Sequence, residues 1–121
     1  MNICITAQGK NLEALVDPRF GRCQYFIIAD TDTLEFEAVV NPNMDTSGGA
    51  GIQSGQLMAE KQVKAVLTGN VGPNAFKTLK AGGIEIITGV SGNIKQAIEK
   101  YKNNEFKTTD KPSVDSHFGT R

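Results

Sequence analysis

The order of strand-like and helix-like segments constrains the fold of this chain most. Three runs rich in β-branched and aromatic residues come first, and after them short apolar runs alternate with amphipathic segments. Strands are predicted at residues 2–7, 24–30, 34–40, 64–68 and 84–88, and helices at about residues 52–62, 73–81 and 94–102. This order predicts an antiparallel hairpin followed by parallel strands, in a mixed five-stranded α/β sheet with helices on its faces.

Signals at the helix ends support this order. Pro73 suits the first turn of the second helix and Gly82 suits its end, while Asn93 and Gln96 have the spacing of a capping box before the third. The order β-β-β-α-β-α-β-α is the one found in ribonuclease-H-like folds, which is the fold class we expect. Residues 1–102 then form one domain, and residues 103–121 form a polar, flexible tail.

Charge and composition exclude several classes of function. The 13 basic and 13 acidic side chains cancel, so no overall field attracts nucleic acid. No apolar run approaches the roughly 20 residues that span a bilayer, and the first residues lack the regions of a signal peptide. We therefore expect a cytoplasmic protein in which Cys4 and Cys23 stay reduced, with Cys4 in the core.

Residues 17–23, Asp-Pro-Arg-Phe-Gly-Arg-Cys, are called the arginine loop below. The Pro/Gly pair allows an unusual backbone shape, so the loop can direct Arg19, Arg22 and Cys23 at a ligand. Two positive charges beside a thiol predict a lowered pKa and a thiolate able to bind metal. The alternative is a tight turn with solvated arginines and Cys23 entering the core.

Two glycine-rich turns, at residues 48–51 and 69–72, each precede a predicted helix. The backbone N–H groups and the dipole at a helix start favour an anion. The second turn also follows a parallel strand, so it should lie at the carboxyl edge of the sheet. Neither turn matches a P-loop or a Rossmann motif, and each alone is also typical of a tight structural connection. The hypothesis is that both turns and the arginine loop surround one anionic ligand.

Three motifs occur in a fixed order: DPRFGR at residues 17–22, GGAGI at residues 48–52 and TGNVGPNA at residues 68–75. Together they resemble the dinitrogenase iron–molybdenum cofactor biosynthesis family, and the similarity runs from Met1 to about Phe106. The resemblance implies a ribonuclease-H-like domain without catalytic activity that binds or carries an iron–sulfur or iron–molybdenum-type cluster or its precursor. Its partners would be metallocluster donor and acceptor proteins, and the chain would be a small stand-alone member, monomeric or weakly homodimeric.

Residue roles follow from this hypothesis. Arg19 and Arg22 would clamp the anion, Phe20 would exclude water, and Cys23 would supply a thiolate, the usual ligand of iron–sulfur clusters. The full set of expected cofactor-binding residues is Arg19, Phe20, Gly21, Arg22, Cys23, Gly48, Gly49, Gly51, Gly69, Asn70 and Gly72. Cluster-carrying members of the family often have histidine where this chain has Arg19, and arginine has no lone pair to give a metal.

Residues 114–119 repeat the Val-Asp-x-x-Phe-Gly spacing of residues 16–21, with His117 at the position of Arg19. The functional interpretation is that the tail brings His117 to the site as a second candidate metal ligand. The alternative is coincidence in a polar terminal segment.

Other functions are less compatible with the sequence. A nuclease of this fold needs carboxylates on the sheet to hold divalent metals, but the strands at residues 2–7 and 64–68 have none. A thiol enzyme at Cys23 lacks a nearby general base, because His117 is the single histidine. The remaining alternative is a metal-free module that binds a small anionic metabolite or a partner protein through the same loop and turns.

Overall fold

The computed structural model describes residues 1–42 and 49–113, and its elements follow the predicted order. The strands are β1 (Asn2–Ala7), β2 (Tyr25–Asp30), β3 (Phe36–Val40), β4 (Ala65–Leu67) and β5 (Glu85–Ile87), and the helices are α1 (Ala50–Glu60), α2 (Pro73–Ala81) and α3 (Ile94–Lys102). The predicted bounds are one or two residues too long at several strand ends, and α1 begins two residues earlier than predicted.

The five strands form one mixed sheet in the order β3-β2-β1-β4-β5. The β2 strand is antiparallel to both β1 and β3, whereas β4 is parallel to β1 and β5 is parallel to β4. This confirms the predicted ribonuclease-H-like α/β arrangement. Because β1 lies in the middle of the sheet, nearly all of its side chains are buried.

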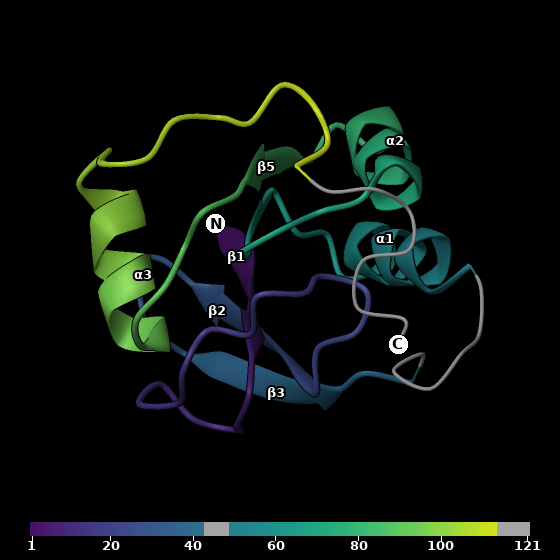
Figure 1. Cartoon of the computed structure of the whole chain (residues 1–121). Coiled ribbons are helices and arrows are strands. Elements are labelled where there is room, and N and C mark those ends of the chain that lie inside the picture. The colour runs from purple at the N-terminus through teal and green to yellow at the C-terminus, as the bar shows by residue number, and fades with distance from the viewer. Residues whose placement is uncertain (43–48, 114–121) are drawn as a thin grey trace.

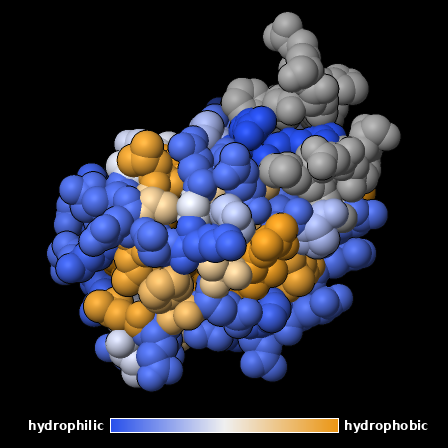
Figure 2. Space-filling model, turned by 90° about the horizontal axis from the view of Figure 1, so that it is seen from below, coloured by the Kyte–Doolittle hydropathy of each residue, from blue (hydrophilic) through white to orange (hydrophobic). Residues whose placement is uncertain are grey.

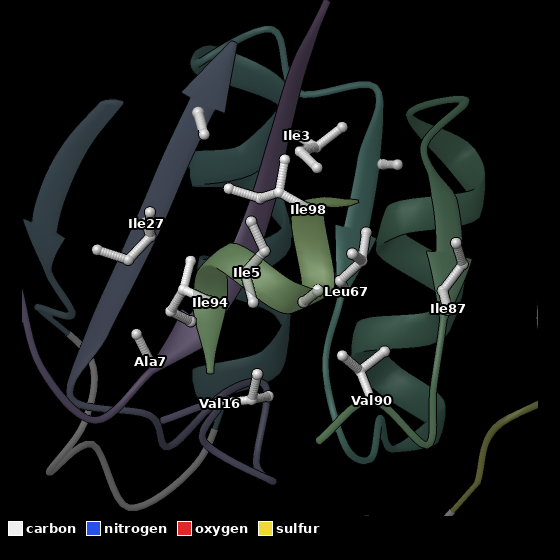
Figure 3. Close-up of a cluster of buried hydrophobic side chains, with 13 residues drawn as sticks. Ile3, Ile5, Ala7, Val16, Ile27, Leu67, Ile87, Val90, Ile94 and Ile98 are labelled. Carbon is white, nitrogen blue, oxygen red and sulfur yellow. The ribbon is translucent and has the colours of Figure 1, made fainter. Parts of the chain in front are cut away.

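Helices cover both faces of the sheet (Figure 1). On one face α3 packs alone, through Ile94, Ala97 and Ile98, and Figure 3 shows this helix lying across the strands. On the other face α1 and α2 bury Met58 and Leu79 against strand residues that include Cys4, Phe26, Val66 and Ile86. Cys4 is fully buried there, which confirms its predicted place in the core.

The start of α3 has the predicted capping box. The side-chain oxygen of Asn93 accepts a hydrogen bond from the Gln96 backbone N–H at 2.8 Å, and the Gln96 side-chain oxygen accepts one from the Asn93 N–H at 3.3 Å. Pro73 likewise occupies the first turn of α2, as predicted. These two helix starts were readable from the sequence because each depends on residues that are neighbours along the chain.

The segment after α3 is predicted to be a polar, flexible tail, and its described part, residues 103–113, hydrogen-bonds to the domain. Phe106 packs against the core under α3. Thr109 donates its backbone N–H to the carbonyl oxygen of Ile86 at 2.7 Å. We call residues 106–113 the strap, because they run past β5 toward α2 (Figure 1).

The outermost strand β3 lies at the bottom of Figure 1, and Figure 2 views the molecule from that side. Several separate hydrophobic areas lie among hydrophilic ones on this face (Figure 2). Phe36 and Val40 of β3 are 41% and 63% exposed. Within residues 1–42 and 49–113, none of the helices has the length and apolar character needed to cross a bilayer.

Candidate functional site

The arginine loop is attached to the carboxyl end of β1. The Thr6 hydroxyl donates to the backbone carbonyl of Asp17 at 2.7 Å, and the Asp17 N–H donates to the Thr6 carbonyl at 2.8 Å. The hydroxyls of Thr6 and Thr68 lie 2.8 Å apart, and both residues are fully buried. These bonds place the loop at the edge of the sheet where β1 and β4 end, which is the edge predicted for a ligand.

Inside the loop, Asp17 fixes Arg19. Its carboxylate accepts hydrogen bonds from the Arg19 backbone N–H at 3.0 Å and from Arg19 Nε at 3.4 Å. The Asp17 side chain is 2% exposed and the Arg19 side chain is 38% exposed. Among the described residues the Arg19 side chain is held through Nε, and its two Nη groups can donate further hydrogen bonds.

The loop also pairs with the second glycine turn. Phe20 donates its N–H to the carbonyl of Asn70 at 3.2 Å, and the Asn70 side-chain amide donates to the carbonyl of Pro18 at 3.2 Å. A Cβ at Gly69 would lie 2.6 Å from the Cα of Pro18. Glycine is therefore required at residue 69 because two backbones approach each other there.

The start of α1 meets the loop from another side. A Cβ on Gly21 would lie 3.2 Å from the backbone nitrogen of Gly51, so the loop and the first turn of α1 are in direct contact. A Cβ on Gly51 would in turn lie 3.0 Å from the Cβ of Ala75 in the first turn of α2. The arginine loop, the start of α1 and the start of α2 thus converge on one place.

The two helices that converge here begin differently from α3. Gly49 is the N-cap of α1, in the left-handed conformation with φ 72°, and Gly72 is the N-cap of α2. No described side chain caps either helix, in contrast to the capping box at Asn93. Glycine at the N-cap supplies no side-chain oxygen to the N–H groups of these first turns, and in α2 the donors begin at Asn74 because Pro73 has no N–H.

Comparison with known proteins identifies the family. A family model described as dinitrogenase iron–molybdenum cofactor matches residues 1–104. The chain belongs to this family. Membership suggests a small cofactor-binding or carrier role in the biosynthesis of the iron–molybdenum cofactor.

Two solved structures and one further relative are also similar to this chain. The apo form of the orange protein from Desulfovibrio gigas is 36% identical, with 93% of this chain and 96% of that chain covered and a TM-score of 0.91. A Thermotoga protein assigned to the DUF35 family is 33% identical, with 93% and 98% covered and a TM-score of 0.79. An uncharacterized protein of Methanocaldococcus jannaschii is 29% identical over 71% of this chain and 75% of its own length.

The structure places Cys23 and Phe20 in surroundings that differ from those expected for their predicted roles. Cys23 is fully buried, and burial, followed by the nearby Cys4 and Asp17, raises its pKa well above the ordinary value of 9.0. The prediction that the arginines lower this pKa is therefore wrong, because the thiol points into the core. Phe20 is 2% exposed and packs against Phe26, so it anchors the loop in the core and does not line an open site.

Sequence reasoning missed Asn41. Its side-chain amide donates to the carbonyls of Gly21 and Cys23, at 3.1 and 2.9 Å, and only 4% of the residue is exposed. It ties the end of the arginine loop to the end of β3. The available signal was its place directly before Pro42, which is typical of a turn but does not identify the partner.

The remaining predicted site residues divide into two groups. Arg22 is half-buried and directly follows Gly21 in the chain. The other described residues of the set, Gly21, Gly49, Gly51, Gly69, Asn70 and Gly72, lie at the convergence. Gly48 and His117 lie outside the described residues. Within residues 1–42 and 49–113, no group of three or more His, Cys, Asp or Glu side chains has the arrangement of a metal site.

A separate pocket of about 380 Å³ lies near the amino end of β1. Its lining includes Glu85, Tyr101 and Phe106. The Tyr101 hydroxyl donates to the Glu85 carboxylate at 3.0 Å, and burial together with Glu85 raises the pKa of Tyr101 to about 12. The lining also includes Asp32 and Lys102, so side chains of both charges meet in this pocket.

Proposed function

We propose that this chain is a non-catalytic carrier of an anionic iron–sulfur or iron–molybdenum-type cluster or its precursor, bound where the arginine loop meets α1 and α2. Membership of the dinitrogenase iron–molybdenum cofactor family supports a cofactor-binding or carrier role. The orange protein, which is similar to this chain, was solved in its apo form. This similarity supports a carrier that can exist with or without its ligand.

The observation that carries the proposal is the convergence of two helix starts without side-chain caps on a loop with two arginines. The contacts of Gly21 with Gly51, and of Gly51 with Ala75, bring these donors together. Backbone N–H groups, helix dipoles and guanidinium groups all favour an anion. A cluster with sulfide or oxygen atoms on its surface presents several hydrogen-bond acceptors to such donors.

This donor set favours reversible binding. Hydrogen bonds and charge hold an anion without a metal–thiolate bond, and the Cys23 thiol is buried and protonated. A ligand held in this way can leave intact when an acceptor protein offers covalent ligands. The implied partners are therefore a cluster donor and a cluster acceptor, with the exchange taking place in the cytoplasm.

A second candidate uses the same geometry. A small anionic metabolite or an acidic partner protein would also satisfy uncapped helix starts and two arginines. This metal-free module predicts stabilisation by phosphate alone, whereas the carrier predicts retention of metal through gel filtration.

The experiment compares the parent chain with two charge-matched double variants. Each protein is incubated without oxygen with iron(II) and sulfide, with and without molybdate, and the metal content per chain is measured after gel filtration. The parent and Lys95→Gln/Lys100→Gln, which changes exposed residues of α3, should retain stoichiometric metal. Arg19→Gln/Arg22→Gln should bind at least about ten-fold more weakly, which corresponds to the loss of roughly one charge-assisted hydrogen bond.

Parent protein that takes up no metal under any of these conditions would contradict the carrier. A rise in Tm with phosphate in that same protein, lost in Arg19→Gln/Arg22→Gln, would then support the metal-free module.

A further inference from the structure

The two edges of the sheet are treated differently. At the β5 edge the strap occupies the outward backbone groups, because Thr109 donates its N–H to the carbonyl of Ile86 at 2.7 Å and its hydroxyl accepts from the Thr88 N–H at 3.0 Å. The opposite edge is β3, which within residues 1–42 and 49–113 pairs with β2 and with no other strand (Figure 1). A strand edge of this kind is a template for pairing with another chain.

Hydrogen bonds at both ends of β3 show which of its backbone groups face outward. Asn41 donates its N–H to the carbonyl of Gln24 at 3.0 Å, and Asp30 donates its N–H to the carbonyl of Glu35 at 2.9 Å. Because bonded pairs alternate along an antiparallel ladder, the odd-numbered residues of β3 bond to β2. The residues that direct their N–H and C=O groups away from β2 are therefore Phe36, Ala38 and Val40.

The side chains of these same three residues share the face of the sheet that α3 covers. Ala38 packs against the core cluster that includes the buried residues of α3. Successive strand residues point to opposite faces, so Phe36 and Val40 lie on the side of Ala38. Both remain exposed. The open edge thus presents apolar side chains beside backbone groups that can form a ladder.

A second copy of β3 fits this edge. Two-fold antiparallel pairing centred on Ala38 places this residue opposite itself and places Phe36 opposite Val40 of the second copy. All three outward-facing residues then lie in bonded pairs, which gives about six hydrogen bonds between the chains. The pair of Phe36 with Val40 occurs twice, and an aromatic residue opposite a β-branched one is a favourable cross-strand contact.

Charge selects this register over its neighbours. Glu37 falls opposite Val39 of the second copy, and each Glu37 carboxylate is paired with Lys61 Nζ of its own chain at 3.1 Å. An axis at Glu37 would instead place the two carboxylates directly opposite each other, which is destabilising. An axis at Val39 would place Phe36 opposite Pro42, which has no N–H to donate.

We propose that β3 is the interface of a two-fold homodimer, in which the two sheets join edge to edge at Ala38. The strand has 5 residues, and so short a ladder buries less than the roughly 1,200 Å² of a standard interface. The dimer should therefore be weak and form only at high protein concentration. It requires no ligand, so it is independent of the proposed carrier function.

The test measures the mean mass of the ligand-free protein by analytical ultracentrifugation from micromolar to millimolar concentration. The mean mass of the parent should rise toward twice that of the monomer. Phe36→Glu/Val40→Glu and Phe36→Lys/Val40→Lys each place like charges opposite one another, so each alone should stay monomeric. Their equimolar mixture places opposite charges together and should form a heterodimer. Leu15→Lys, which changes an exposed apolar residue outside β3, should dimerise like the parent.

Parent protein that stays monomeric throughout this range would overturn the inference. So would a dimer that both charged variants form as readily as the parent, because its interface would then lie elsewhere. Hydrogen exchange gives an independent measurement of the register. The N–H groups of Phe36, Ala38 and Val40 should exchange more slowly as the parent concentration rises, and unchanged rates in a dimeric sample would contradict the pairing.

Discussion

The Asp17 carboxylate, with 2% of its side chain exposed, accepts hydrogen bonds from both the backbone N–H and Nε of Arg19, at 3.0 and 3.4 Å. This pair gives the arginine loop its shape and orients one of the two guanidinium groups of the candidate site. The geometry of the candidate site therefore depends on the buried Asp17 carboxylate as well as on the two arginines.

Removing that carboxylate should destabilise the fold. Asp17→Ala leaves the Arg19 N–H without its partner, and we expect the free energy of unfolding to fall by about 1–3 kcal/mol. Asp17→Asn retains an acceptor oxygen, so its free energy of unfolding should lie between those of the parent and of Asp17→Ala. Urea denaturation gives these values, and Glu13→Ala, an exposed carboxylate nearby, should change stability by less than about 0.5 kcal/mol. Equal effects of Asp17→Ala and Glu13→Ala would contradict this role.

Glycine at residue 69 should be essential to the junction between the loop and the turn. The added Cβ of Gly69→Ala would meet the Pro18 backbone at 2.6 Å, so one of the two segments must move, at a cost of about 1–3 kcal/mol. In the matched control Gly82→Ala, the nearest atom is the flexible end of Ile84 at 3.5 Å. Thermal denaturation should therefore show a clear drop in Tm for Gly69→Ala and a small change for Gly82→Ala. A larger drop in Tm for Gly82→Ala than for Gly69→Ala would show that the two backbones are not in tight contact at residue 69.

The buried thiols predict a pH dependence. Burial raises the pKa of Cys4 and of Cys23 above the ordinary value of 9.0. The folded state thus keeps these protons to higher pH than the unfolded chain, so their stabilising contribution is complete below about pH 9 and is lost as the pH rises further. Urea denaturation between about pH 7 and pH 10.5 should show a steeper loss of stability in the parent than in Cys23→Ala. Identical slopes would indicate that Cys23 is accessible as a thiolate.

The uncapped start of α2 predicts opposite effects on stability and on binding. Gly72 has φ −85° and ψ 175°, a conformation that suits an aspartate N-cap. Gly72→Asp should therefore raise the free energy of unfolding by a few tenths to about 1 kcal/mol while weakening ligand binding, because its carboxylate competes for the same N–H groups. Asn93→Ala, which removes the cap of α3, is the control. It should lower the free energy of unfolding by about 1 kcal/mol and leave ligand binding unchanged. Unchanged binding in Gly72→Asp would exclude the start of α2 from the site.

Much of the fold was predictable because its signals are local. The three helices, the capping box at Asn93 and the order of parallel and antiparallel strands follow from periodicity and turn chemistry. The rule that ligands bind at the carboxyl edge of such sheets predicted the place of the turn at residues 69–72. The meeting of the arginine loop with the start of α1 was a hypothesis without such a rule, because α1 follows the antiparallel strand β3.

The orientations of particular side chains were not predictable in the same way. The arginines close to Cys23 in the sequence suggested a reactive thiol. The direction of the Cys23 side chain, however, depends on packing against Cys4 and on Asn41, which is 18 residues away along the chain. The strap was missed because it is held by scattered hydrogen bonds of Thr108, Thr109 and Ser113 and by the packing of Phe106. Such contacts leave no periodic pattern in the sequence.

We propose that the two helix starts and the arginine loop form one anion site. The most direct measurement is the change in backbone amide chemical shifts of the ¹⁵N-labelled protein during titration with molybdate, a diamagnetic anion. We expect the largest changes at Gly51 and Ala75 and in the arginine loop, with little change at Lys95 and Gln96 behind the capped start of α3. Changes concentrated at α3 or around Glu85 and Tyr101, with none at Gly51 and Ala75, would contradict it.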